Sequence, residues 1–127
     1  MTDDRQKGTP QTLREIDISP LRNILEMAGP ANQQALIAAF LDDLKSTEFG
    51  LDHAWSGPDC AALRLHSHVL IALAGTVGDT DLQAEAQNLN ELARDRDLVK
   101  IEAMKVRTMR GLKDLIATLA TFIPTEE

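Results

Sequence analysis

Histidine is the residue type in this chain best suited to chemistry near neutral pH, and it occurs three times, as His53, His66 and His68. A free imidazole has a pKa of about 6.5, so near pH 7 much of it is neutral and can act as a nucleophile, a base or a metal ligand. His66 and His68 lie two residues apart in an apolar segment. Wound as a helix at about 100° per residue, this segment points the two rings roughly 200° apart. One ring must therefore face the protein interior and the other the solvent.

His68 is the histidine that we expect to face solvent. The inward face of its helix carries a stripe of mostly apolar residues, Leu63, His66, Leu70, Leu73 and Val77. The opposite face carries Arg64, His68, Ile71, Ala72 and Gly75. Because Ala72 and Gly75 have almost no side chain, another protein could approach the His68 ring closely. This arrangement predicts a reactive histidine.

The other two histidines have simpler interpretations. His66 is predicted to be a buried imidazole satisfied by a neighbour, and His53, next to Asp52, an ordinary surface residue near a helix C-terminus. A metal site is not predicted, because the rings of His66 and His68 diverge and no cysteine or carboxylate stands one turn from His68. An enzyme built on His66 or His53 is disfavoured, since no acid or nucleophile is spaced to assist either ring.

Four long amphipathic helices should position these side chains. The sequence predicts a short helix that begins with the capping hydroxyl of Ser19 and Pro20 and ends near Gly29. It also predicts helices over about 32–55, from Asp59 to Gly78, from a capping box of Thr80 and Gln83 to about residue 94, and over about 99–123. Short connections favour an all-α fold, an antiparallel up-down-up-down four-helix bundle with a short extra N-terminal helix.

Composition limits the function further. The 127 residues fit one domain, with residues 1–14 as a flexible arm, and 43% apolar and 26% charged residues indicate a globular protein. The net charge of −7 argues against a nucleic-acid partner. No apolar run approaches a membrane span and no secretory signal is evident, so no membrane partner is expected. A single cysteine, Cys60, allows no intrachain disulfide, and a cytoplasmic location is expected.

Several segments resemble the histidine phosphotransfer (HPt) domain family. The family signature is a histidine followed by a leucine, a lysine-glycine pair, small residues and a glycine, and residues 68–78, His-Val-Leu-Ile-Ala-Leu-Ala-Gly-Thr-Val-Gly, follow this order. Further matches are the phenylalanine-leucine-acidic stretch at 40–44, Pro58-Asp59 leading into Leu63 and Arg64, and Leu82, Leu89 and Asn90 where the family has leucines and a glutamate. The resemblance spans about residues 16–123.

The resemblance implies a four-helix HPt domain over residues 15–124, with His68 as the phosphoacceptor of a multistep phosphorelay. The implied partners are receiver domains of response regulators and a hybrid histidine kinase. The protein would be a phosphoryl carrier rather than an enzyme; it would bind no cofactor itself, and the receiver would bring Mg²⁺. The docking ring around His68 would consist of Leu65, Ile71, Ala72 and Gly75. A self-contained bundle of this kind is expected to be a monomer.

Two positions depart from the family pattern. Ile71 stands where the family has lysine, and Ala72 where it has glycine. Isoleucine cannot offer positive charge to a phosphoryl group, whereas Arg64, one turn before His68 on its face, could supply it. The missing lysine also leaves an alternative open: a degenerate HPt-like bundle that binds a receiver or kinase as an interaction module without carrying phosphate.

Overall fold

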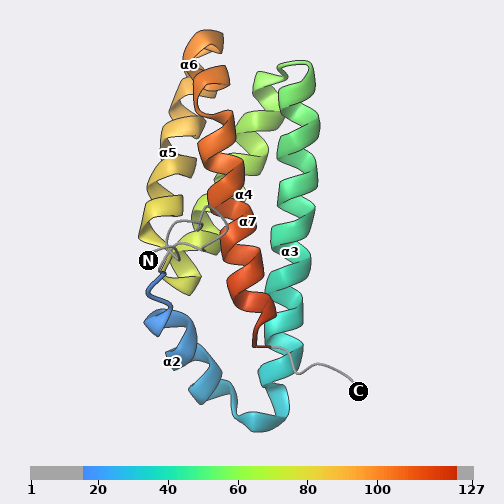
Figure 1. Ribbon diagram of the computed structural model, residues 1–127, viewed down its shortest axis with the longest axis vertical. Helices are drawn as coiled ribbons and strands as arrows, with labels where there is room; N and C mark the ends of the chain where they lie inside the picture. Colours follow the sequence, from blue (N-terminus) through green and yellow to red (C-terminus); the bar gives the residue numbers. More distant parts are fainter. Residues whose placement is uncertain (1–15, 123–127) are drawn as a thin grey trace, which may run out of the picture.

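The computed structural model describes residues 16–122, and within this range all regular structure is α-helical. The predicted all-α class is confirmed. The helices are α2 (Ser19–Ala28), α3 (Pro30–Ser56), α4 (Cys60–Val77), α5 (Thr80–Asp95), α6 (Leu98–Ala103) and α7 (Lys105–Ala120). Figure 1 shows α3, α4, α5 and α7 running along the long axis of a helical bundle, with α2 at one end and α6 at the other. The arm predicted over 1–14 lies outside the described residues.

Aspartate caps begin three of the helices. One carboxylate oxygen of Asp59, Asp79 and Asp97 accepts a hydrogen bond from the backbone N–H three residues later, over 3.1, 3.1 and 3.2 Å. The capping box predicted at Thr80 is therefore wrong, because Asp79 already provides the cap. Gly78, with a φ of 100°, ends α4 in the left-handed conformation that its sequence position predicts.

Ser19 also differs from its predicted role. The helix already includes Ser19, and no side chain caps its N-terminus. The Ser19 hydroxyl and backbone N–H both donate to one oxygen of Asp17, over 2.7 and 3.0 Å. These two hydrogen bonds lower the pKa of the exposed Asp17 carboxyl. Ser19 is thus a donor to the preceding carboxylate and not an acceptor for the helix.

The last predicted helix is broken in two at Met104. The backbone carbonyl of Ile101 is the acceptor that a continuous helix would offer to residue 105. In the structure it accepts instead from the buried indole N–H of Trp55 and from the N–H of Met104, each over 3.2 Å. A side chain that takes a helical carbonyl is a recognised cause of a kink. Trp55 of α3 therefore locates the boundary between α6 and α7.

The core is aliphatic, as the near absence of aromatic residues predicts. Its fully buried large side chains come from every described helix and are Leu21, Ile37, Leu44, Leu51, Leu63, Leu70, Leu82, Leu89, Ile101, Leu112, Leu115 and Leu119. Leu63, Leu70 and Val77 of the predicted α4 stripe lie in this core. The expected core ring of His66 is only partly buried.

Gly50 explains where the His66 ring lies. A Cβ built on Gly50 would lie 2.4–2.7 Å from three atoms of that ring, so the imidazole rests directly on the backbone of α3. Gly50 is therefore a contact point between α3 and α4. Any side chain at position 50 would push the two helices apart or displace the ring.

One described helix, α4, is long and apolar enough to cross a membrane by length and composition, with a mean hydropathy of 1.4 over 18 residues. This differs from the sequence-based expectation that no run comes close to a span. The core helices of globular proteins can share this length and composition.

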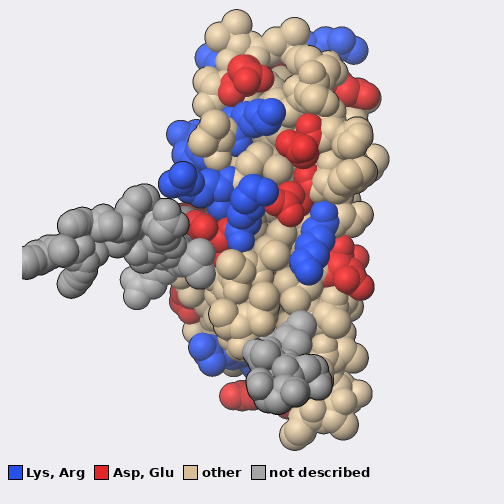
Figure 2. Space-filling model, turned by 45° about the vertical axis from the view of Figure 1, so that its right-hand side comes forward, with Lys and Arg blue, Asp and Glu red and all other residues tan. Residues whose placement is uncertain are grey.

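Charged side chains are unevenly spread over the surface. Figure 2 shows Lys and Arg over the upper half of one face, with Asp and Glu side chains lying between them. The pattern matters because the whole chain is acidic.

We expect Gly50→Ala to lower the free energy of unfolding by about 1 kcal/mol. Overpacking typically costs about 1–3 kcal/mol, which outweighs the gain of up to about 1 kcal/mol that alanine brings to a helix. Denaturant unfolding followed by circular dichroism measures the change. Gly57→Ala is the control, because a Cβ there meets nothing within 4 Å. A Gly50→Ala protein as stable as the wild type would contradict the His66–Gly50 contact.

Candidate functional site

His68 lies near the middle of α4, on the side of the helix that no other described helix covers. The exposed residues of α4 form one stripe, Ala61, Arg64, Leu65, His68, Val69, Ala72 and Thr76. No hydrogen bond to the His68 ring is formed by any residue in 16–122, so both ring nitrogens are open to solvent or to a partner. This is the exposure that a phosphoacceptor needs, while the role itself stays a prediction.

The four predicted docking residues divide into two pairs. Leu65, with 60% of its surface exposed, and Ala72 lie open beside His68. Ile71 and Gly75 are partly buried and turn toward α5. A Cβ on Gly75 would lie 2.4 Å from the side-chain nitrogen of Gln83. The prediction that Gly75 lets a partner approach closely is therefore wrong, because a neighbouring helix already occupies that space.

Val69 is an apolar neighbour that the sequence analysis missed. It is 38% exposed and lies on the α3 side of His68, next to Leu65 in the exposed stripe. Its sequence gives no indication of this exposure, because an apolar residue in an apolar helix is expected to lie in the core. The open apolar surface beside His68 therefore consists of Leu65, Val69 and Ala72.

Two amide side chains of α5 hold the segment of α4 that carries His68. Asn90 Nδ2 donates to the backbone carbonyl of Arg64 over 3.0 Å and to the hydroxyl of Ser67 over 3.1 Å. Gln83 Nε2 donates to the backbone carbonyl of Ile71 over 3.4 Å, a longer and weaker bond. The two bonds lie four residues before and three residues after His68. They bracket its helical turn, and their register shows that α4 and α5 run antiparallel.

The role of Asn90 and Gln83 in holding α4 was not predicted from the sequence. The signal that could have revealed it is their spacing: the two amides are seven residues apart on α5, as are the two carbonyls on α4. Seven residues are two helical turns, so both pairs fall on one seam. Ser67, which is fully buried, belongs to the same seam and also donates to the Arg64 carbonyl over 3.1 Å.

Arg64 is exposed, and among residues 16–122 no carboxylate forms an ion pair with its guanidinium. Its backbone is fixed by Asn90 and Ser67, while its side chain is available. A cation one turn from an exposed imidazole can interact with an anionic group carried by that ring.

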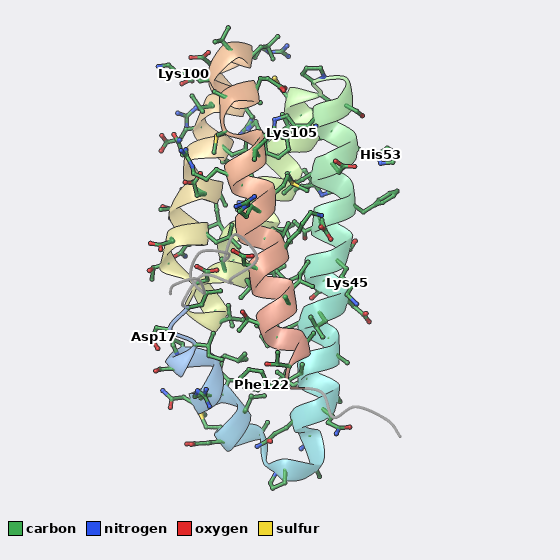
Figure 3. All side chains as sticks on the ribbon, viewed as in Figure 1. Asp17, Lys45, His53, Lys100, Lys105 and Phe122 are labelled. Carbon is green, nitrogen blue, oxygen red and sulfur yellow. The ribbon has the colours of Figure 1, made fainter. Side chains whose placement is uncertain are left out.

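The three histidines do not converge on one centre. His66 lies on Gly50 at the α3 side of α4, whereas His53 is exposed on α3 with its ring centroid 4.5 Å from that of Phe49. Figure 3 shows His53 pointing away from the bundle. Both rings line a hollow of about 510 Å³ between α3 and α4 that also includes Asp59. Within the described chain, no three His, Cys, Asp or Glu side chains come together closely enough to hold a metal ion.

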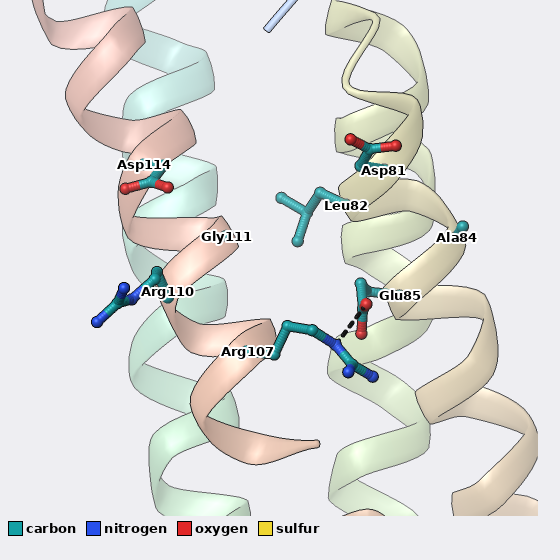
Figure 4. Close-up of a pocket in the computed structure, with 8 residues that line it drawn as sticks. All are labelled: Asp81, Leu82, Ala84, Glu85, Arg107, Arg110, Gly111 and Asp114. Atoms are coloured by element: carbon teal, nitrogen blue, oxygen red, sulfur yellow. Dashed lines mark ion pairs between the residues drawn. The ribbon is translucent and has the colours of Figure 1, made fainter. Parts of the chain in front are cut away.

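A second hollow of about 410 Å³ lies between α5 and α7 (Figure 4). Its rim mixes both charges, with Asp81, Glu85, Asp114, Arg107 and Arg110, and Arg107 Nε lies 2.7 Å from a Glu85 oxygen. No single ligand charge is favoured there. The hollow is also away from His68, since α7 packs against α3 and α5 across the bundle from α4.

Comparisons of the chain with known protein families, with curated proteins and with solved structures found no match. Any functional assignment therefore depends on the residues and their geometry.

We expect Asn90→Ala to lower the free energy of unfolding by about 1–2 kcal/mol, because it removes the donor to Arg64 O and leaves the buried Ser67 hydroxyl with one partner fewer. Thermal or denaturant unfolding measures this. Asn88→Ala, an exposed asparagine on the same helix, should change stability by less than about 0.5 kcal/mol. Equal effects of the two substitutions would show that the Asn90 bonds do not secure α4 to α5.

Proposed function

We propose that this protein is a histidine-containing phosphotransfer protein that relays a phosphoryl group between receiver-domain aspartates through His68. The observation that carries the proposal is the exposed imidazole of His68. Its helix is held by hydrogen bonds from the side-chain amides of Asn90 and Gln83, one before and one after His68 along the chain. The accompanying fold is the up-down-up-down four-helix bundle of α3, α4, α5 and the α6–α7 pair, with α2 at one end. The antiparallel register of α4 and α5 and the short connections support this topology.

The chemical step needs only a neutral ring and an in-line approach. The lone pair of His68 Nε2 attacks the phosphorus of the receiver's aspartyl phosphate. A P–N bond forms as the P–O bond to the aspartate breaks, and the carboxylate leaves with the bonding electrons while the ring proton stays on Nδ1. Nε2 is the atom that the family resemblance implies. An open face and a fixed backbone let His68 meet this geometry without rearrangement.

Magnesium would supply charge neutralisation to the phosphoryl oxygens, and the proposal assigns it to the receiver. Near His68 this chain offers an arginine and apolar side chains rather than the oxygen ligands that Mg²⁺ prefers. The protein is accordingly a phosphoryl carrier and not an autonomous enzyme. Its partners would be receiver domains and a hybrid histidine kinase, met as a monomer in the cytoplasm.

Leu65, Val69 and Ala72 would form the apolar contact with the receiver. Small apolar areas of this kind suit transient association. Arg64 would supply the positive charge that Ile71 cannot. The alternative, a bundle that binds receivers without carrying phosphate, is favoured by that missing lysine, and the two functions differ in whether His68 becomes phosphorylated.

Incubation with radiolabelled phospho-receivers from the same organism tests the proposal. We expect one of them to transfer label to the wild-type protein in an acid-labile, base-stable form, and no label to appear on His68→Gln. His53→Gln, which changes another exposed histidine, is the control and should be labelled normally. Binding of a receiver without any label on the wild type would overturn the carrier function and favour the interaction module.

Arg64→Ala should slow phosphotransfer about tenfold, equivalent to about 1.4 kcal/mol of transition-state stabilisation. The expected cause is the loss of a cation that faces the transferred phosphoryl oxygens. Rapid-quench kinetics with the same phospho-receiver measures the rate, and Arg64→Lys should recover most of it. An unchanged rate and an unchanged phosphohistidine lifetime in Arg64→Ala would exclude the role of Arg64.

A further inference from the structure

Positive charge is concentrated in one segment of this acidic chain. Residues 94–113 hold seven of the thirteen Lys and Arg but only three of the twenty Asp and Glu, so the segment carries +4 within a chain of net charge −7. The outward side of α6 and α7 presents the exposed residues Val99, Lys100, Val106, Arg107, Arg110 and Lys113, which we call the basic α6–α7 face. Figure 2 shows cations on this side of the molecule, with Asp and Glu side chains between them.

Two aliphatic side chains protrude from the basic α6–α7 face. Val99 is 81% exposed and Val106 is 74% exposed, and neither lines any of the hollows described between the helices. Val99 lies on α6 and Val106 on α7, on either side of the break at Met104. Exposed aliphatic side chains flanked by Lys and Arg are typical of helices that lie at a membrane interface.

The cations of this face are available to a partner. Arg107 pairs with Glu85 and Lys113 with Glu48, but the side chains of these two cations are 67% and 64% exposed, and surface ion pairs of this kind contribute little. Lys100 lies 4.0 Å from Asp97, at the limit of an ion pair. Within residues 16–122, Arg110 has no carboxylate partner.

We propose that the basic α6–α7 face docks on an anionic lipid bilayer, with α7 parallel to the membrane plane. The cations along α7 are complementary in charge to the negative headgroups. The exposed side chains of Val99 and Val106 can insert between the lipids at the membrane interface. The acidic remainder of the chain is repelled by the same surface, which fixes the orientation. This departs from the expectation, drawn from composition, that the protein has no membrane partner.

This orientation leaves the His68 face free. α7 packs against α3 and α5, and α4 packs against the same two helices, so α4 and α7 lie across the bundle from each other. His68 would then point away from the bilayer. The inference does not depend on the proposed phosphotransfer, because lipid binding is measured without it.

Cosedimentation with phosphatidylcholine vesicles, with and without phosphatidylglycerol, tests the docking. We expect binding only to the vesicles that contain phosphatidylglycerol, and weaker binding as salt rises. Arg110→Gln should lower the affinity about fivefold, as the loss of one cation near an anionic surface does. Arg22→Gln, which changes an exposed arginine of α2 at the opposite end of the bundle from α6, should leave the affinity unchanged. Val99→Asp should abolish binding.

Glu102 provides a test in the opposite direction. It is exposed between Val99 and Val106, where its carboxylate opposes an anionic surface. Glu102→Gln should therefore raise the affinity about fivefold. No binding to either vesicle, or equal binding by Arg110→Gln and Arg22→Gln, would overturn the proposal. Binding to a polyglutamate peptide but not to vesicles would overturn it too and assign the face to an acidic protein. Circular dichroism checks that each variant keeps its helices.

Discussion

The arrangement of this molecule depends on how α4 is held between its two neighbours. On one side the His66 ring rests on the backbone of Gly50, which brings α3 close. On the other side Asn90 and Gln83 donate to backbone carbonyls of α4, which secures α5. In both contacts a polar or ring side chain meets the backbone of the neighbouring helix. Such contacts fix the register of the two helices along their axes as well as the distance between them. The third side of α4 is left open, and His68 lies on that side.

Much of the fold could be predicted from the sequence, because apolar spacing and glycine stops are local signals. The stripe of Leu63, Leu70 and Val77 and the left-handed Gly78 are of this kind. The break at Met104 could not be predicted. It depends on the Trp55 indole reaching Ile101, a contact between residues 46 positions apart. Periodicity records which face of a helix is buried, but not which carbonyl another helix will take.

In the candidate site, too, the features that depend on one helix could be predicted, whereas the contacts with another helix could not. The outward direction of His68 follows from helix geometry alone, and the structure exposes it. The errors concern the α5 side: Gly75 was expected to be open because it is small, yet small residues also let helices pack closely. Gln83 fills that space. A single sequence cannot distinguish a glycine that makes room for a partner protein from one that makes room for a neighbouring helix, because both roles require the absence of a side chain.

A phosphotransfer role of His68 requires positive charge beside its ring. Positions 64 and 71 are seven residues apart, so they lie on the same edge of α4, one on either side of His68 along the axis. Helical side chains lean toward the N-terminus of their helix, so a cation at 71 would lean toward the imidazole, whereas Arg64 leans away from it. Arg64 must fold back over its own helix to reach a phosphoryl group on His68. The length of its side chain allows this, but at a cost in rotamer freedom that a lysine at 71 would avoid. In the proposed phosphotransfer, Arg64 would therefore supply only part of the charge neutralisation, and the receiver would supply the rest.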